Sequence, residues 1–462
     1  MKRFLTVFVT ALLLTAALCV TASASDFDAA AEDLSKIGMF RGTANGFELD
    51  RAPTRSEAAI MLVRLYGAED TAKADYEAGK IQHPFTDVSD FTAPYVAWLY
   101  TNGIANGTSA ATFGSAKACT IQNYAAFLLR ALGYKDGTDF QYADVLTFAQ
   151  SKGFYEPVMF SGTFLRDDLA ALTYQALAAD MKDGKTYLLD SLIQSGAIDE
   201  KAASGIQAKI DAYRGMEKAM GGVESTSMDA DIDMKMNMSM SAAGETAETA
   251  ATTTTGNMKV IAADPANIQM ASTMKTTMEG ESMDIGMWMK DGWVYLSTTS
   301  AGETTQLKYA IDDETAALSS LGIVDIDAVN VSGLAMLDSI AAKKSGSDTV
   351  YTMVIGKGMN GLMAGVLGLT GETAGMNMDL GDITASYTVG SNGKLKSVDM
   401  VFAADMKMEL PLEDGTTASM SIHYDYDMTM KINAMGSDVK ITYPDFSKFQ
   451  KIDPTQVPDL AA

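Results

Sequence analysis

Two arginines, Arg55 and Arg166, have the residue type and the position to bind an anion. Each stands at the start of a segment whose apolar residues recur at helical spacing. A guanidinium is a planar, permanently charged donor that matches a carboxylate, and a helix N-terminus adds oriented N–H groups beneath it. A structural role is the alternative for Arg55, because Thr54 and Glu57 form a capping box around it.

Signatures of catalysis and of metal binding are missing from the sequence. It holds no G-x-S-x-G elbow, no H-E-x-x-H or C-x-x-C pair, and no D-x-D-x-D-G calcium loop. The only histidines are His83 and His423, which excludes a His-rich metal site. We therefore predict no catalytic residue, no metal site and no cofactor, and a protein that is not an enzyme.

The segments that carry the two arginines belong to a threefold repeat. Three helical segments match one another, and a glycine-containing loop precedes each: Arg55–Gly67, Ile121–Gly133 and Arg166–Ala178. Stacked units of this kind bury a shared core that one unit could not bury alone. We expect an all-α bundle of three repeats, at about 25–68, 84–134 and 140–184.

The second repeat carries a motif of a known family. FTDV (Phe85–Val88) is followed there by Trp98, Gly103 and Phe113, while Thr54-Arg55-Ser56-Glu57 stands in the first repeat. This pattern resembles the S-layer homology (SLH) domain, which occurs in triplets on Gram-positive surface proteins and anchors them to pyruvylated secondary cell-wall polysaccharide. The resemblance implies a polysaccharide site made of Arg55, Glu57, Asp87, Trp98, Gly103 and Arg166.

The resemblance also implies what these residues would do. Arginine would bind the pyruvate carboxylate, Trp98 would stack on a sugar ring, and Gly103 would let the backbone approach the ligand. Core packing is an equal alternative for Trp98, and Asp87 also stands where an N-cap or near-cap of the next helix is expected. The motif is degraded in the second repeat, where Ile121 replaces the arginine.

The N-terminus predicts export. Lys2 and Arg3 precede an apolar run, Phe4–Val20, and Ala22-Ser23-Ala24 follows as a small-residue cleavage site. We expect a signal peptide over residues 1–24, with an uncleaved membrane anchor as the alternative. The formal charge of -24 argues against nucleic acid as a partner. Together with the SLH resemblance, this implies a secreted, S-layer-associated protein at the wall or surface of a Gram-positive-type cell.

The composition of the chain changes between residues 185 and 214. Residues 25–184 carry a net charge of -8, whereas the chain from Lys185 onward carries -18 and is rich in Met, Thr, Ser and Gly. A charge difference of this size supports separate domains. We expect a connector of one or two helices at 185–214, a second domain at 215–452 and a tail at 453–462.

Apolar and polar residues of the second domain alternate with a period of two. Met234, Met236 and Met238 share one face of a predicted strand, and charged residues fill the other. Glu281–Thr298 predicts a hairpin that turns at Asp291-Gly292. We expect about eight to ten strands in a curved antiparallel half-barrel. The low-complexity segment 242–255 is expected to form an exposed hairpin loop.

Three apolar segments predict helices that cover the sheet: Asp312–Ile323, Ser332–Lys343 and Gly358–Leu369. This layout and the run MKDGWVYLST resemble the LolA/LppX-like lipoprotein fold. Relatives with that fold hold acyl chains between sheet and helices. The chain as a whole is therefore expected to be an α+β multidomain protein.

The methionines of the sheet allow three interpretations. An unbranched thioether suits a cavity for variable apolar ligands, thioethers also bind Cu(I), and ordinary core filling needs no ligand. The candidate cavity residues are Met234, Met236, Met238, Met287, Met289, Met406, Met408, Met428 and Met430.

The predicted function is a surface protein anchored to wall polysaccharide, whose C-terminal domain binds an apolar ligand such as lipid. The alternative is a structural or adhesive module with a packed C-terminal domain and no ligand.

Overall fold

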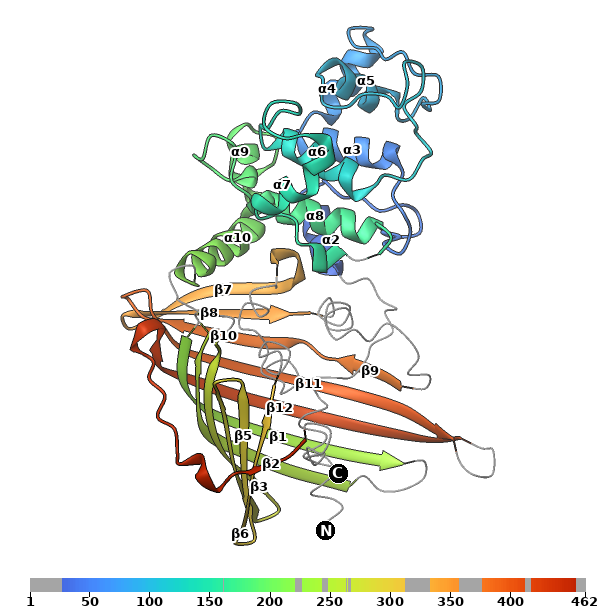
Figure 1. The fold of residues 1–462 in the computed structure, drawn as a ribbon. Coiled ribbons are helices and arrows are strands. Elements are labelled where there is room, and N and C mark those ends of the chain that lie inside the picture. Colours follow the sequence, from blue (N-terminus) through green and yellow to red (C-terminus); the bar gives the residue numbers. More distant parts are fainter. Residues whose placement is uncertain are drawn as a thin grey trace. The chain divides into compact units, whose positions relative to one another are not determined.

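The computed structural model describes residues 27–160, 162–220, 227–242, 248–262, 264, 267–311, 333–356, 376–411 and 417–453. These residues form two compact units. The helical unit contains the residues up to Arg214 and a later segment that ends at Ser339, and the sheet unit contains the other described residues. Figure 1 shows the helices of the first and the strands of the second, so the predicted α+β class is confirmed.

The helical unit contains the three repeated helices at their predicted starting points. Thr54 caps α3 (Arg55–Leu65), and its capping box with Glu57 is formed as predicted. Thr120 caps α6 (Ile121–Ala131), and α8 (Arg166–Ala178) begins at the second arginine. The remaining helices are α2 (Asp28–Lys36), α4 (Glu69–Glu77), α5 (Ala93–Thr101), η1 (Tyr142–Asp144), α7 (Val145–Ser151), η2 (Pro157–Phe160), α9 (Leu188–Gln194) and α10 (Glu200–Met220).

The helices pack through buried apolar stripes. Leu62 of α3, Leu128 of α6 and Leu172 of α8 are all fully buried. Contacts join α6 to α8, α3 to α5 and α2 to α8. The predicted connecting helices are α9 and α10, and α10 ends at Met220 rather than near 214.

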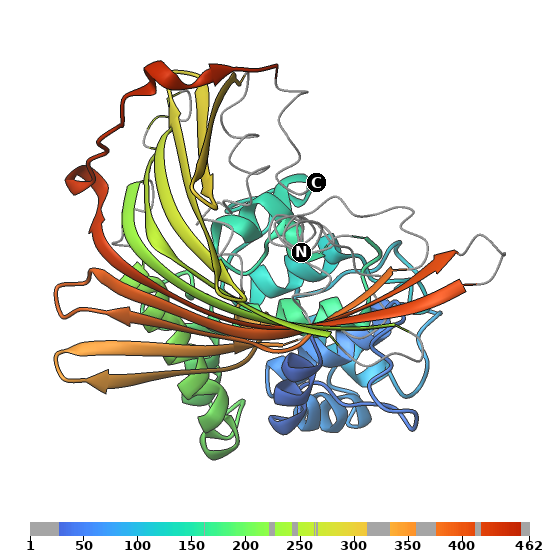
Figure 2. The same cartoon turned by 90° about the horizontal axis from the view of Figure 1, so that it is seen from below.

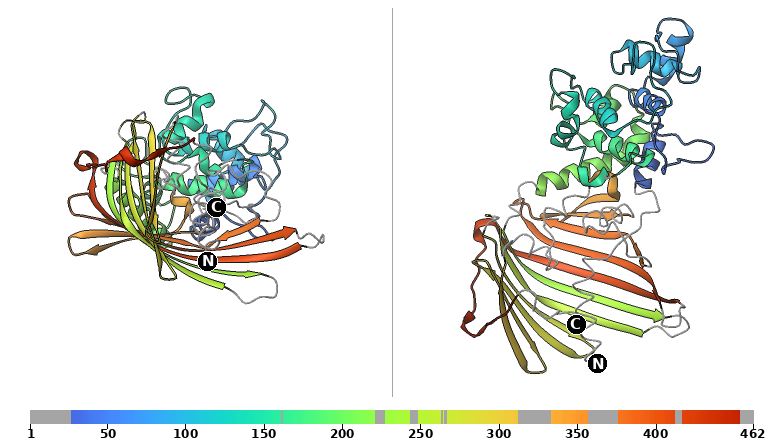
Figure 3. Two further views of the ribbon diagram at one scale, coloured as in Figure 1. Left: turned by 60° about the horizontal axis from the view of Figure 1, so that its bottom comes forward. Right: turned by 45° about the vertical axis from the view of Figure 1, so that its right-hand side comes forward.

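The sheet unit is one open, strongly curved sheet (Figures 2 and 3). Its described strands number thirteen, in the order β13-β6-β5-β4-β3-β2-β1-β12-β11-β10-β8-β7, with β9 paired to β11. Neighbours pair antiparallel except for β13 and β6. The strands are β1 (Ser227–Ala242), β2 (Glu248–Ile261), β3 (Gln269–Met278), β4 (Glu281–Lys290), β5 (Trp293–Ser300), β6 (Glu303–Ala310), β7 (Leu337–Ser345), β8 (Asp348–Ile355), β9 (Met376–Leu380), β10 (Ile383–Val389), β11 (Leu395–Pro411), β12 (Thr417–Met435) and β13 (Gln450–Lys451).

The predicted hairpin of β4 and β5 is confirmed. Asp291 and Gly292 both have positive φ, 53° and 74°, as a two-residue turn between twisted strands requires. The hairpin predicted around 242–255 is formed by β1 and β2, but the predicted bounds of its loop are wrong, because β1 extends to Ala242 and β2 already starts at Glu248. The threonine run therefore lies in a strand, where β-branched residues are favoured.

The helix predicted for Ser332–Lys343 is also wrong. Its described part forms a short 3-10 turn, η3 (Leu334–Met336), and then enters β7. Leu334 and Leu337 are fully buried, and η3 packs on α8 and α2 within the helical unit. Tertiary packing and strand pairing override the local helical spacing here. The other two predicted helices lie outside the described residues.

The period-two alternation divides the sheet into two faces. On β1, Met236 is buried while its neighbours Lys235 and Asn237 are exposed. Directly opposed residues of paired strands share a face, and Met234 opposes Met428 on β12. We term the side that carries these methionines the methionine face, and the other side the polar face.

Candidate functional site

Arg55, the first residue of α3, makes its contacts inside the helical unit. It is 8% exposed, and its guanidinium donates to the carbonyls of Phe113 at 3.1 Å and Asn106 at 3.3 Å. It also reaches Asn123 Oδ1 at 3.3 Å and lies over the Phe113 ring. The arginine of the first repeat therefore binds the glycine-containing loop of the second repeat.

Arg166, the first residue of α8, repeats this arrangement. It is 5% exposed, donates to the Phe47 carbonyl at 2.9 Å and lies over the Phe40 ring. Its Nη1 also forms an ion pair with Glu57 Oε1 at 3.0 Å. The arginine of the third repeat thus binds the loop of the first repeat.

The Glu57 carboxylate is surrounded by donors. Arg51 donates to both of its oxygens, at 2.6 and 3.0 Å, and the Thr54 backbone N–H donates at 2.8 Å. Burial alone would raise the pKa of Glu57, but these donors and Arg166 lower it to about 2. Both carboxylate oxygens therefore have charged partners within the protein.

The three repeat helices α3, α6 and α8 form a ring of equivalent positions, in which the first residue of one helix is matched with the third residue of another, and one of the three matches lacks an arginine. Arg55 contacts Asn123, the third residue of α6, and Arg166 contacts Glu57, the third residue of α3. The equivalent pair between α6 and α8 is Ile121, the first residue of α6, and Asp168, the third residue of α8. Isoleucine has no charge with which to bind this carboxylate. Burial raises the pKa of Asp168 to about 6, although the Leu165 N–H donates to its carboxylate at 2.7 Å.

Asp87 closes the loop of the second repeat instead of capping a helix. The N-cap prediction is wrong, because α5 begins at Ala93 with Thr92 in the N-cap position. The Asp87 carboxylate accepts N–H groups of Phe113 and Gly114 at 2.7 Å, and of Ser115 at 3.1 Å. Partial desolvation would raise the pKa of Asp87, and these three donors hold it below its usual value.

Trp98 and Gly103 lie at the C-terminal end of α5 and in the turn after it. Trp98 is half-buried, with its ring 5.5 Å from the ring of Tyr66, so part of the indole faces solvent. Gly103 has a φ of +67°, and a Cβ added to it would meet no atom within 4 Å. Its N–H donates to the Tyr100 carbonyl at 3.1 Å, so ending the helix already requires glycine here.

The sequence analysis missed two residues of the same region. Arg51 pairs with Glu57 from outside the repeated helix, and no periodic pattern marks it. Gly107 lies where a Cβ would collide with the Phe85 ring and with the Ser109 and Thr112 carbonyls. The run Gly107-Thr108-Ser109 is a turn signal in the sequence. The glycine lets Phe85 and the loop carbonyls pack closely against the backbone, so its role lies within the loop.

The nine predicted methionines all fall on the methionine face, but not at one place. Met236 and Met289 are buried, whereas Met234, Met238, Met287, Met428 and Met430 are half-buried. Met406 and Met408 belong to this face by register, opposite Ile422 and Met420.

The predicted methionines form two groups separated by strands. One group spans β1, β11 and β12, and the other lies on β4. Strands β2 and β3 separate them, a distance of roughly 14 Å at the usual strand spacing. The β4 group packs with Met270, Val294 and Leu296 in a buried cluster.

Within the described stretches, no group of three or more His, Cys, Asp or Glu side chains is placed to hold a metal ion. None of the described helices is both long and apolar enough to cross a membrane. Cys119 is a buried free thiol, and burial raises its pKa to about 12.

Comparison with known families supports the interpretation of the second repeat. Residues 84–120 match the S-layer homology domain. The SLH likeness thus applies to the second repeat, at residues 84–120. The matched segment includes α5 and the loop that Asp87 closes. This match indicates association with the cell surface or cell wall. Residues 211–319 match a family of unknown function, DUF6612.

Two solved structures are similar to about half of this chain. LprF from Mycobacterium bovis is 11% identical with a TM-score of 0.26, over 52% of this chain and 97% of that chain. The LolA superfamily protein NE2245 from Nitrosomonas europaea is 10% identical with a TM-score of 0.13, over 49% of this chain and 95% of that chain. No curated protein matched the sequence. At such values the likeness carries no ligand over to this sheet.

Proposed function

We propose that the helical unit anchors the protein to cell-wall polysaccharide. The SLH match at residues 84–120 carries this proposal, because such domains bind wall polysaccharide. The arrangement of Arg55 and Arg166 is consistent with it, since each arginine ties the start of one repeat to the loop of another. A closed set of loops is a preorganised surface for a glycan.

A surface that binds a sugar needs side chains whose hydrogen-bonding groups or aromatic faces are not already occupied within the protein. Arg55, Arg166, Glu57 and Asp87 already bond within the helical unit. We therefore assign them to holding the loops in place. Trp98 is half-buried and offers part of an aromatic face, so we assign sugar stacking to it.

Sedimentation of the full chain with purified cell walls tests this assignment. We expect the protein to sediment with intact walls and to remain in solution with walls stripped of their polysaccharide. Trp98→Ala should weaken binding roughly tenfold, the effect of about 1.4 kcal/mol of lost contact. Tyr142→Ala is the matched control, because Tyr142 is an exposed aromatic residue of the third repeat. Equal sedimentation with stripped walls would overturn the proposal.

For the sheet unit we propose binding of an apolar ligand along the methionine face. The supporting observation is that Met234 and Met428, directly opposed on β1 and β12, are only half-buried. Flexible thioethers at such positions adapt to ligands of different shape. The competing proposal, a structural or adhesive sheet without ligand, requires that no molecule accompany the purified protein.

Native mass spectrometry of the full chain, purified without detergent, separates the two proposals. A bound mass in the lipid range that organic solvent removes supports the ligand. Met428→Gln should then reduce the bound fraction, whereas Thr429→Gln, the adjacent exposed position, should not. A bare protein mass that does not change after incubation with phospholipid and fatty acid supports the structural module.

A further inference from the structure

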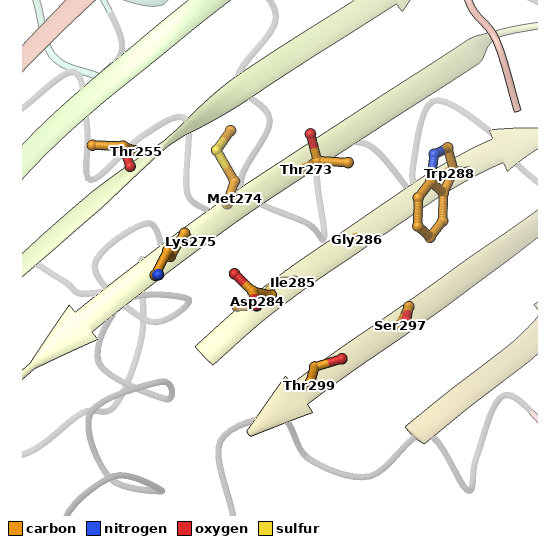
Figure 4. A pocket seen from close by; sticks show the side chains of 10 residues that line it. All are labelled: Thr255, Thr273, Met274, Lys275, Asp284, Ile285, Gly286, Trp288, Ser297 and Thr299. Carbon is orange, nitrogen blue, oxygen red and sulfur yellow. The ribbon is translucent and has the colours of Figure 1, made fainter. Parts of the chain in front are cut away.

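The polar face of the sheet has a hollow that is separate from the methionine face. It encloses about 330 Å³ and is lined by residues of β2, β3, β4 and β5 (Figure 4). Gly286 lies at its centre, and a Cβ at this position would collide with the indole of Trp288. Figure 4 shows Trp288 at one end of the hollow and Lys275 with Asp284 at the other. The missing side chain of Gly286 thus gives the Trp288 indole room to lie against the strand at the hollow.

The indole of Trp288 is held in place by the C-terminal end of the sheet unit. Phe446, the first residue of η5 (Phe446–Lys448), and Phe449, the residue after it, approach the indole edge-on with ring centroids 5.9 and 6.0 Å away. Phe446 also stacks on Tyr295 at 3.7 Å. The orientation of the indole therefore does not depend on a ligand, and little conformational entropy is lost when one binds.

Apart from Thr299, which bonds to Thr304, the polar side chains that line the hollow have no hydrogen-bond partner among the described residues. The hydroxyls of Thr255, Thr273 and Ser297 bond to no other residue that the structure describes. Lys275 and Asp284 oppose each other across β3 and β4, and neither forms an ion pair with a described residue. Donors and acceptors on four neighbouring strands thus line a hollow that has one aromatic ring at its end.

We propose that this hollow binds a neutral pyranose unit of a glycan. The C–H face of a pyranose packs on an indole, and its hydroxyl groups both donate and accept hydrogen bonds, as Thr273, Ser297 and Asp284 require. The volume of about 330 Å³ is at the lower end for small-molecule sites. An acyl chain would leave these polar groups unpaired, and the opposed charges of Lys275 and Asp284 balance, which favours a neutral ligand over an ion.

The test uses the full chain and soluble neutral disaccharides, namely cellobiose, maltose and chitobiose. Saturation-transfer NMR should detect at least one of them on the protein, and calorimetric titration should give its affinity. The double variant Thr273→Val with Ser297→Ala removes two hydroxyls at nearly constant shape and should weaken binding at least tenfold. Thr277→Val is the control, because Thr277 lies on the same strand and face outside the hollow.

Two further variants separate this site from the helical unit. Trp288→Leu should abolish binding while the far-UV circular dichroism stays that of the native chain. Tyr142→Ala should leave the affinity for the disaccharide unchanged, since Tyr142 is an exposed aromatic residue of the helical unit. The proposal fails if none of the three sugars binds at millimolar concentration. It also fails if the double variant binds as tightly as the native chain.

Discussion

The helical unit and the sheet unit are organised in different ways. In the helical unit, single polar residues join one repeat to another, as Arg166 does through Phe47 and Glu57. In the sheet unit, a periodic pattern places side chains on one face or the other, and many methionines share one face. The effect of a substitution on stability should therefore depend on the individual residue in the helical unit, and on which face carries the residue in the sheet unit.

The largest expected effect tests the faces of β1. Met236→Asp places a charge where the native side chain is 3% exposed, and should destabilise the sheet unit by about 4 kcal/mol or more. Asn237→Asp, one residue further on the exposed face, should cost less than about 1 kcal/mol. Hydrogen exchange of the backbone amides in β1 and β12 measures the loss of stability in both variants. Similar losses from the two variants would contradict the division into faces.

The next effect tests which unit the segment before β7 stabilises. Leu334 is fully buried against helices of the helical unit, although it lies far along the chain. Leu334→Ala should cost about 2–4 kcal/mol, the usual effect of a buried cavity. The loss of hydrogen-exchange protection should appear in α8 and α2. Lys344→Ala, exposed on β7, serves as control. A loss confined to the strands would refute the assignment.

A somewhat smaller effect tests the arginine contacts. Arg166→Ala removes an ion pair and a hydrogen bond to the Phe47 carbonyl, while Arg51 still pairs with Glu57. We expect a loss of about 2–3 kcal/mol in the helical unit. Arg41→Ala breaks an ion pair whose arginine is largely exposed, and should cost about 1 kcal/mol or less. Chemical denaturation followed by Trp98 fluorescence compares the two, in a Trp288→Phe and Trp293→Phe background.

The two units also differ in how much the sequence predicted. Helix starts were correct where a cap marks them, as at Thr54 and Thr120. The hairpin at Asp291-Gly292 was correct because few residue pairs tolerate two positive φ angles. The segment at Leu334 was predicted wrongly, because its burial comes from α8, a partner distant in sequence that local spacing does not reveal.

The candidate site residues show the same limit. Residue type identified Arg55 and Arg166 as anion binders, whereas the structure shows their guanidinium groups on loop carbonyls. Arg51 completes the carboxylate cluster without any pattern in the sequence. Trp288 is an aromatic residue on the polar face of the sheet, where the alternation predicts polar side chains. Its role in the hollow depends on its contacts with Gly286 and Phe446, and the sequence pattern does not reveal them.

The smallest effect concerns Asp168, and it comes with a characteristic pH dependence. Its pKa in the folded protein is about 6, against an ordinary value of 3.8. The folded state therefore binds this proton more tightly than the unfolded state, and stability from Asp168 falls as the pH rises from about 4 to about 6. The Glu57 carboxylate has the opposite effect on stability, because its pKa is lowered from 4.5 to about 2. Its stabilising contribution is present above about pH 4.5 and is lost as the pH falls toward 2.

Ile121→Arg would supply the charge that the other two positions of the ring possess. If residue 121 faces Asp168 as the repeat implies, the variant lowers the pKa of Asp168 and removes the loss of stability between pH 4 and 6. At neutral pH the helical unit should gain about 1–2 kcal/mol. Ile121→Gln controls for loss of the apolar side chain. The measurements are a carbon-13 NMR titration of the Asp168 carboxyl group and denaturation midpoints at several pH values. An unchanged titration of Asp168 in the arginine variant would mean that residue 121 does not contact Asp168. Only the contacts of Arg55 and Arg166 would then follow the repeat.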